Sequence, residues 1–391
     1  MQGFKRLLSI SSFTQLADEL VSAKIILPWV FLTLNAPIWM LSLLVPLKES
    51  GSLLPQWSVK QALRSRYQTG LIWRSGMIVQ GASLGLLLTV LLLPVAGRSY
   101  IGLFSVVLLS VGRALCSFTV KDIQAHNIAK GERGKLIGLG GSISGLLTIV
   151  VSVYLLQLQD IAHKIPILTG LLISGFTCYA IGCWLSISLA MPTGLELSKQ
   201  GSLLQFWQQT PLLRKIVYQR SAVLHGALVM PYMVLAVASE QAMYSSLPWF
   251  MLGGAIASFL SSAVWGALSD DSALHTMQKA IAMTLLGAFG FYLIWYCELT
   301  SIWLMMLCFA IGNLGYAGVR TARKTYLLDI VESDIRQQYV ASGNTLVGLV
   351  LLGLGGLYAV LYSVLSTHLI LVCVAMLLVG AWITSRMPKE K

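Results

Sequence analysis

Long apolar segments separated by short polar connections run through the whole 391-residue chain. Crossing a hydrocarbon core about 30 Å thick takes roughly 20 mostly apolar residues in a helix. Twelve segments are long enough when some tilt is allowed. They are residues 12–35, 36–60, 70–95, 100–122, 136–157, 165–190, 213–237, 245–268, 277–297, 300–322, 338–361 and 365–385. We therefore predict an all-α integral membrane protein with twelve transmembrane helices.

The positions of the basic residues predict how these helices are oriented. Nearly all Lys and Arg residues outside the spans lie at the two ends or in alternate connections, which are 60–69, 122–135, 191–212, 269–276 and 323–337. The intervening connections carry two, Arg98 and Lys164. Because Lys and Arg are enriched in cytoplasmic loops, we expect both termini in the cytoplasm. The short loops suit a multi-pass protein of a bacterial inner membrane.

Composition excludes several other classes of protein. A chain with 56% hydrophobic and 11% charged residues does not have a water-soluble surface. The net charge of +12 is not concentrated in a basic tail, so we expect no nucleic-acid partner. The six cysteines lie in apolar stretches without metal-type spacing, and we expect small core residues. The five histidines are scattered, so we expect no metal, cofactor or catalytic residue and no enzyme.

An internal repeat relates the two halves of the chain. Sliding the sequence by 203 residues places Pro28-Trp29 over Pro231-Tyr232. The same offset places Gly112, Ala114, Lys121, Arg133, Gly145 and Leu146 over Gly315, Ala317, Lys324, Arg336, Gly348 and Leu349. A slightly larger shift places Pro37, Met40, Leu41 and Ser50 over Pro248, Met251, Leu252 and Ser261. Such repeats are typical of transporter folds, and we predict six-helix bundles at 1–190 and 213–391 joined by a cytoplasmic linker at 191–212.

Two short motifs add a family resemblance. The run from Gly266 to Asp270, Gly-Ala-Leu-Ser-Asp, resembles the G-x-L-x-D loop motif of the major facilitator superfamily, and Leu109-x-x-x-Arg113 resembles the start of a fourth-span motif of that family. The resemblance implies two bundles around a central cavity, a cytoplasmic gate motif at Gly266 and Asp270, an Arg113 associated with proton coupling, and a monomer. Cys116-Ser117 replaces the usual Gln-Gly, and the fifth-span Gly-Pro pair is absent, so no subfamily is assigned.

Ionisable residues inside the predicted spans are the candidate coupling or substrate-binding residues. A charge at bilayer depth costs roughly 2.5–3.5 kcal/mol even on lenient scales. The candidates are Asp18, Glu19 and Lys24 in the first span, Lys48 and Glu49 in the second, and Arg113 in the fourth. Their similar depths predict one network, in which a carboxylate exchanges its Arg or Lys partner for a proton or a substrate charge.

Spacing narrows the partners within this network. Lys24 follows Asp18 and Glu19 by six and five residues, which is not the spacing that brings side chains together on one helix face. We therefore expect Lys24 to pair with Glu49, beside a backbone opened by Pro46, and Arg113 to reach Asp18 or Glu19.

Two alternatives remain open for these charges. Lys48 and Glu49 are interfacial if the second span is short, and Asp18 and Glu19 are first-turn residues in the headgroup region if the first helix begins late.

The second half shows fewer intramembrane charges and one candidate, His225, which titrates near neutral pH or has a hydrogen-bonded structural role. Tyr232, Trp249, Asn313 and Tyr316 accompany it as polar or aromatic candidates. We expect the first half to provide coupling and the second half to shape substrate contact. In the fifth span, Gly134, Gly138, Gly141 and Gly145 share one face and predict close helix packing.

These features favour a secondary active transporter that works by alternating access. Acidic residues in the first span together with Arg113 favour proton-coupled efflux of a small organic compound such as a drug, siderophore or metabolite. Uptake by proton symport and lipid flipping are the alternatives within this class. A polytopic membrane enzyme or receptor is the competing class.

Overall fold

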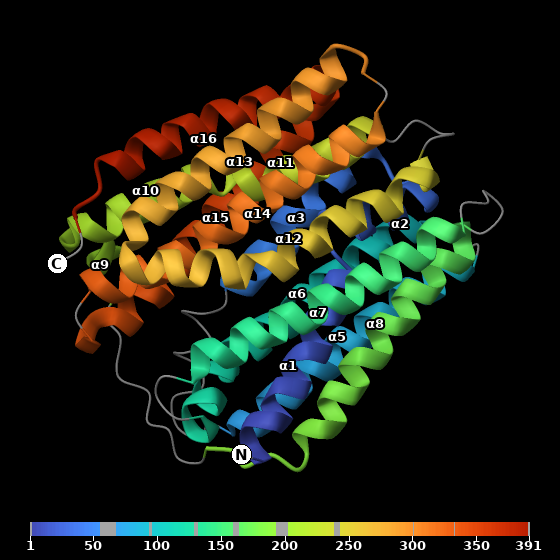
Figure 1. Ribbon diagram of the computed structural model, residues 1–391. Helices are drawn as coiled ribbons and strands as arrows, with labels where there is room; N and C mark the ends of the chain where they lie inside the picture. The colour runs from blue at the N-terminus through green and yellow to red at the C-terminus, as the bar shows by residue number, and fades with distance from the viewer. Residues whose placement is uncertain are drawn as a thin grey trace.

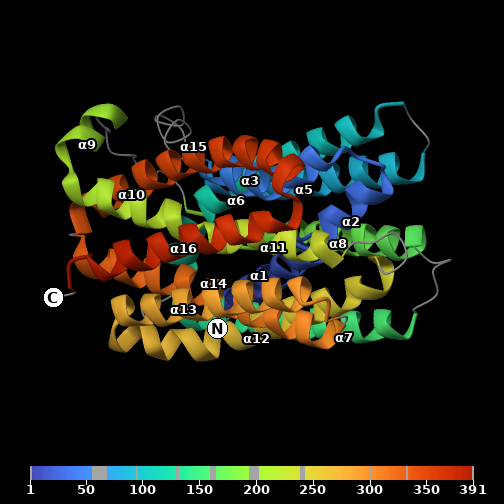
Figure 2. The ribbon, with the colours of Figure 1, turned by 90° about the horizontal axis from the view of Figure 1, so that it is seen from above.

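The computed structural model describes residues 2–54, 68–93, 96–128, 132–158, 164–192, 202–237, 243–299, 301–331 and 333–389. These residues are mostly helical, with turns between the helices, and contain no strand. The helices run along one common direction, and both ends of the chain lie at the same end of the bundle (Figures 1 and 2). We call this the terminal side of the molecule.

Helices of the first half come first along the chain. They are α1 (Gln2–Leu20), α2 (Ile26–Thr33), α3 (Ile38–Leu53), α5 (Thr69–Leu92), α6 (Arg98–Asn127), α7 (Arg133–Gln157) and α8 (Lys164–Ser186). A short helix, α9 (Leu203–Gln209), lies in the predicted linker.

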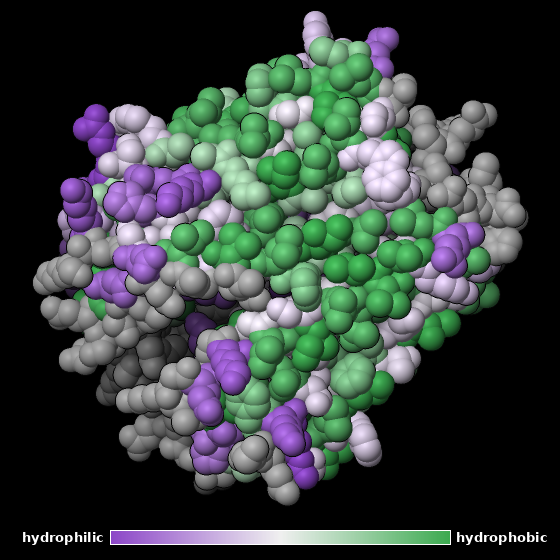
Figure 3. Space-filling model, in the orientation of Figure 1, coloured by the Kyte–Doolittle hydropathy of each residue, from purple (hydrophilic) through white to green (hydrophobic). Residues whose placement is uncertain are grey.

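Helices of the second half follow this linker. They are α10 (Pro211–Val223), α11 (His225–Val237), α12 (Met243–Asp271), α13 (Ala273–Tyr296), α14 (Ile302–Ile330), α15 (Ser333–Leu365), the 3₁₀ turn η2 (Ser366–His368) and α16 (Leu369–Ser385). In the described part of the chain, eight helical segments are long and apolar enough to cross a membrane. Hydrophobic side chains cover the middle of the surface in Figure 3, as a bilayer requires.

The first helix differs from the sequence prediction in two ways. It begins at Gln2 and not near residue 12, and the predicted first span is two helices, α1 and α2, separated by residues 21–25. The predicted seventh span is also divided, into α10 and α11 at Leu224. The first interruption lies just before Pro28, which cannot donate a backbone hydrogen bond to the preceding turn. Pro231, which the repeat aligns with Pro28, lies inside the continuous helix α11, seven residues after the second interruption at Leu224.

The most extensive contacts between the halves are those of α3 with α15 and of α7 with α12, and α2 and α3 make smaller contacts with the second half. Both pairs approach closely through glycine. A Cβ on Gly145 would lie 2.8 Å from the backbone nitrogen of Phe259, and one on Gly348 would lie 3.2 Å from that of Leu54. Pro46 packs against Gly355 inside a continuous α3, so the expected opening of the backbone at Pro46 is wrong.

The side of the molecule opposite the termini is closed around α2. Six of its eight residues are buried, from Ile26 to Phe31, and the helix contacts α3, α8, α11 and α12. On the terminal side, Figure 3 shows the surface hollowed between the two halves. Among the described residues, the halves therefore pack closely around α2, and the surface between them is hollowed on the terminal side.

Candidate coupling and substrate site

The site forms around the interruption between α1 and α2. The carbonyl oxygen of Ser22 accepts hydrogen bonds from the amides of Ile25, Ile26 and Leu27, which starts α2 in a new register. Because Pro28 has no N–H, the first turn of α2 suits it and a continuous helix does not. The break leaves the carbonyl of Val21 outside the helical ladder, and the Nζ of Lys48 donates to it at 2.9 Å.

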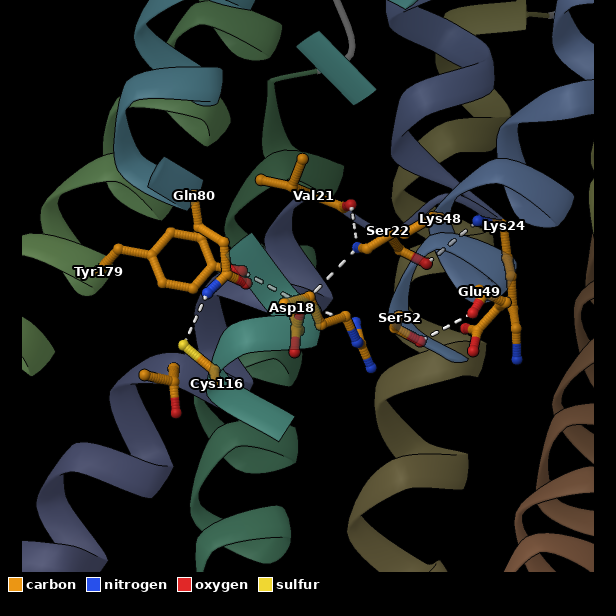
Figure 4. A network of polar contacts seen from close by, with 12 residues as sticks. Asp18, Val21, Ser22, Lys24, Lys48, Glu49, Ser52, Gln80, Cys116 and Tyr179 are labelled. Carbon is orange, nitrogen blue, oxygen red and sulfur yellow. Dashed lines mark hydrogen bonds and ion pairs between the residues drawn. The ribbon is translucent and has the colours of Figure 1, made fainter. Parts of the chain in front are cut away.

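Asp18 is the centre of the contacts on the first-half side (Figure 4). Its Oδ1 atom accepts a hydrogen bond from Nη1 of Arg113 at 2.8 Å and from the hydroxyl of Tyr179 at 3.2 Å. The Nζ of Lys48 lies 3.7 Å from the same oxygen. Four helices, α1, α3, α6 and α8, therefore meet at one carboxylate. Depth along the spans allowed either Asp18 or Glu19 as the partner of Arg113. In the structure the partner is Asp18.

Electrostatics explain why this carboxylate needs two cations. Asp18 and Glu19 lie in the last turn of α1, where the helix dipole is negative and a carboxylate is disfavoured. The alternative that they are first-turn residues is wrong, since α1 begins at Gln2. The positive charges of Arg113 and Lys48 offset both the charge of the carboxylate and the partial negative charge of the helix end. Lys48 is only 3% exposed, so it is a buried residue of the bundle and not an interfacial one.

Asp18 and Arg113 are nevertheless open to solvent-accessible space. Their side chains are 30% and 29% exposed, although Ala17, Leu20 and Val21 beside Asp18 are buried. Since Asp18 faces three other helices of its own half, this exposure is toward the interior of the molecule and not toward lipid. Water or a small solute can reach the pair from there.

The neighbouring residues of the broken span contact the second half. Oε1 of Glu19 accepts a hydrogen bond from the hydroxyl of Ser258 in α12 at 3.0 Å. The Nζ of Lys24 lies over the ring of Tyr316 in α14, 4.8 Å from its centroid. Residues 18–24 therefore contact side chains of both halves.

Glu49 does not form the ion pair expected from its depth. It interacts electrostatically with Lys24 and Arg113, but the direct ion pairs in the described part of the chain are those of Asp18 with Arg113 and Lys48. The predicted Lys24–Glu49 pair is therefore wrong. Depth along a span does not give the direction in which a side chain points around the helix.

The structure also brings second-half cations to the site. Arg320 lies 5.7 Å from the centroid of the Tyr316 ring and interacts electrostatically with Glu19, Lys24 and Glu49. Arg220 of α10 donates to the side chain of Asn344. The expectation that charge gathers in the first half overlooked these two residues, although both fall inside predicted spans.

His225 lies away from these charges, at the start of α11. It is 1% exposed, its Nδ1 is 2.8 Å from the carbonyl of Ala222, and its ring packs at 5.6 Å from that of Tyr358. These contacts hold the end of α10 at the second interruption. Tyr179 and Ser258 were missed by sequence reasoning, because a hydroxyl in an apolar span gives no signal by itself.

The remaining predicted residues lie at helix contacts or helix ends. Gly266 and Asp270 are in the last turns of α12, and the surroundings of their side chains lie outside the described part. Ser272, two residues after Asp270, caps α13 because its side chain accepts a hydrogen bond from the amide of His275.

The glycine face of α7 contacts two helices. Gly141 faces Gln15 of α1, while Gly145 faces Phe259 of α12. Gly134 and Gly138 lie in α7.

Cysteines and metal-ligating residues add no further site. All six cysteines are free, and Cys297 is exposed, so the expectation that all six are core residues is wrong for that one. In the ranges described above, His, Cys, Asp and Glu form no group of three suited to a metal ion.

Comparisons with known proteins place this geometry in a structural class. No protein-family model and no curated protein matches the chain. Among solved structures, the nucleoside transporter NupG has a TM-score of 0.74 at 13% identity, covering 99% of this chain and 100% of that one.

Two further solved structures are similar over nearly the whole chain. The xylose transporter XylE from E. coli, in a partially occluded inward open conformation, has a TM-score of 0.67 at 11% identity, covering 99% and 100% of the two chains. The E. coli fucose:proton symporter FucP has a TM-score of 0.59 at 13% identity, covering 99% of each. The chain has the fold of the major facilitator transporters and is a multi-pass membrane protein.

Proposed function

We propose that the protein is a secondary active transporter that exports a small organic compound in exchange for protons by alternating access. Its twelve spans form two six-helix bundles, 1–190 and 213–391, around a central cavity. The transporter is a monomer without a cofactor, and it lies in a bacterial inner membrane with both termini in the cytoplasm.

One observation carries the coupling proposal. Asp18 is held by Arg113, Lys48 and Tyr179 beside a broken span, and is partly exposed to the interior. A carboxylate of this kind takes up a proton when its cations leave and releases the proton when they return, because nearby positive charge favours its ionised form. The fold of the solved transporters supports the same class.

Movement of the halves would change these contacts. Glu19 and Lys24 reach Ser258 and Tyr316 across the interface of the halves, so rocking would pull on residues 18–24 and shift Asp18 against Arg113. In the proposed cycle a proton from outside binds Asp18, the halves reorient, and the proton leaves to the cytoplasm as Arg113 pairs again. Substrate moves in the opposite direction.

The test is transport in everted membrane vesicles with an imposed pH gradient. Vesicles containing the protein are supplied with pools of labelled drugs, siderophores and metabolites, and accumulation inside is measured with and without the gradient. Proton-coupled export predicts accumulation that stops when the gradient is collapsed. Accumulation that does not depend on the pH gradient contradicts proton coupling.

Controls in the same preparation separate the remaining alternatives. Right-side-out vesicles that accumulate the compound under an inward proton gradient would establish uptake by symport, and movement of labelled lipid between leaflets would establish flipping. Vesicles with Arg113→Ala, at equal protein content, should not accumulate the compound. Normal transport by that variant would reject the network around Asp18.

A further inference from the structure

Two cations lie over the ring of Tyr316, and two more interact with it electrostatically. Arg320 lies over this ring from its own helix, and Lys24 lies over it from the broken first span. Arg323, one helical turn from Arg320, and Arg220 of α10 interact electrostatically with each other and with Tyr316. We call Lys24, Arg220, Arg320 and Arg323 the cation cluster.

The carboxylates nearby do not balance this charge. Asp18 is engaged by Arg113 and Lys48, and Glu19 accepts a hydrogen bond from Ser258. Glu49 interacts with Lys24, Arg320 and Arg323 but is directly paired with none of them. Four cations therefore face one carboxylate that has no direct cationic partner among the described residues.

Two of these cations, Arg220 and Arg320, lie within predicted spans. Arg320 lies ten residues before the end of α14 at Ile330, about 15 Å along the helix axis. Arg220 lies nine residues after the start of α10 at Pro211, about 13 Å along its axis. Arg220 and Arg320 thus fall within the predicted spans 213–237 and 300–322, whereas Arg323 is the first residue of the basic connection 323–337.

The side chains of the cluster are available to a ligand. Arg320 is exposed, and since it interacts with Glu19, Lys24 and Glu49 of the first half, its exposure is toward the space between the halves. Arg220 uses one nitrogen on Asn344, while its Nε is buried without a hydrogen-bond partner in the described part. A buried guanidinium N–H without an acceptor is costly, and an oxygen-bearing anion would satisfy it.

We propose that the cation cluster binds an anionic group of the transported compound, a carboxylate or a phosphate. The proposal rests on the proposed transport function and narrows its substrate class to small organic anions. Each guanidinium can hold two oxygens in parallel hydrogen bonds, and Lys24 adds a point charge. Cation–π contact with Tyr316 holds Lys24 and Arg320 on one ring, which keeps both charges next to the same ligand position.

The test is a thermal-shift titration of the full-length protein in detergent at low salt, without any gradient. The probes share one ring and differ in charge: benzoate, phenyl phosphate, benzyl alcohol and benzylamine. The proposal expects benzoate or phenyl phosphate to raise the melting temperature, with no rise from the other two. Comparing the two anions distinguishes a carboxylate site from a phosphate site.

Variants assign the effect to the cluster. Arg320→Gln, which replaces an exposed side chain and should fold, is expected to weaken the apparent affinity for the anion at least tenfold, and Arg220→Gln should do the same. Lys215→Gln removes one exposed charge from the same helix as Arg220 and should leave the apparent affinity for the anion unchanged. If no anion protects, if benzylamine protects equally, or if Lys215→Gln loses as much affinity as Arg320→Gln, the proposal is wrong.

Failure of this inference and failure of transport are distinguishable. Anion binding in detergent without gradient-dependent movement in vesicles would contradict the coupling mechanism and leave the anion site in place. Gradient-driven movement of cationic or neutral compounds, without anion binding, would contradict the anion site and leave the transporter in place.

Discussion

Replacing Asp18 with Asn tests the coupling site most directly. The substitution keeps the size of the side chain and removes the charge that Arg113 and Lys48 share. At an effective dielectric constant of about 20, unit charges 2.8 Å apart attract by about 6 kcal/mol and charges 3.7 Å apart by about 4.5 kcal/mol before desolvation is counted. Most of this attraction is offset by removing the three groups from water.

The net cost of the substitution lies between two measured limits. Surface ion pairs contribute about 0–1 kcal/mol, whereas removing one partner of a buried pair costs about 3–5 kcal/mol. Since Asp18 and Arg113 are 30% and 29% exposed, we expect Asp18→Asn to destabilise the protein by about 2 kcal/mol. The double variant Asp18→Asn, Arg113→Gln leaves fewer unpaired charges and should recover about half of that loss.

The assay compares stability with transport in the same variants. Melting in detergent should fall for Asp18→Asn and partly recover in the double variant, whereas gradient-driven transport in vesicles should be lost in both. Asp271→Asn, at an exposed carboxylate, is the matched control and should leave both measurements unchanged. A double variant that transports at the rate of the parent under a proton gradient would refute the coupling role.

Three further predictions concern helix contacts. Gly112→Ala would place a Cβ 2.7 Å from the carbonyl oxygen of Gly76, so it should lower stability by about 1–3 kcal/mol in a thermal melt. Gly85→Ala, in the same helix pair, has open space around the new Cβ and should leave stability unchanged. Gly145→Ala should weaken the contact between α7 and α12 in this conformation, measured as faster labelling of cysteines placed in the hollow between the two halves. An unchanged labelling rate would contradict a close contact at Gly145. Lys48→Met keeps a long side chain but loses the hydrogen bond to the Val21 carbonyl. It should slow transport with little loss of membrane-inserted protein. Transport at the parent rate would contradict a role for that hydrogen bond.

Parts of the site follow from the sequence. Charges in apolar spans identified Asp18 and Arg113. Helical rise placed Arg113 close to the midplane and Asp18 about two turns or less toward the cytoplasm, because the distance along a helix depends on residue number alone. The pairs that failed, such as Lys24 with Glu49, depend on how each helix is rotated about its axis.

What the sequence determined by itself is the all-helical membrane architecture and the set of charges buried in it. Those follow from hydrophobic length and from the cost of charge in lipid, which act residue by residue. The tertiary structure decided the partners: Tyr179 and Lys48 on Asp18, Ser258 on Glu19, and Arg320 beside Lys24 on Tyr316. Partners depend on how each helix is rotated about its axis and on contacts between halves that are far apart in the sequence, as for Lys24 and Tyr316. No local sequence pattern encodes them.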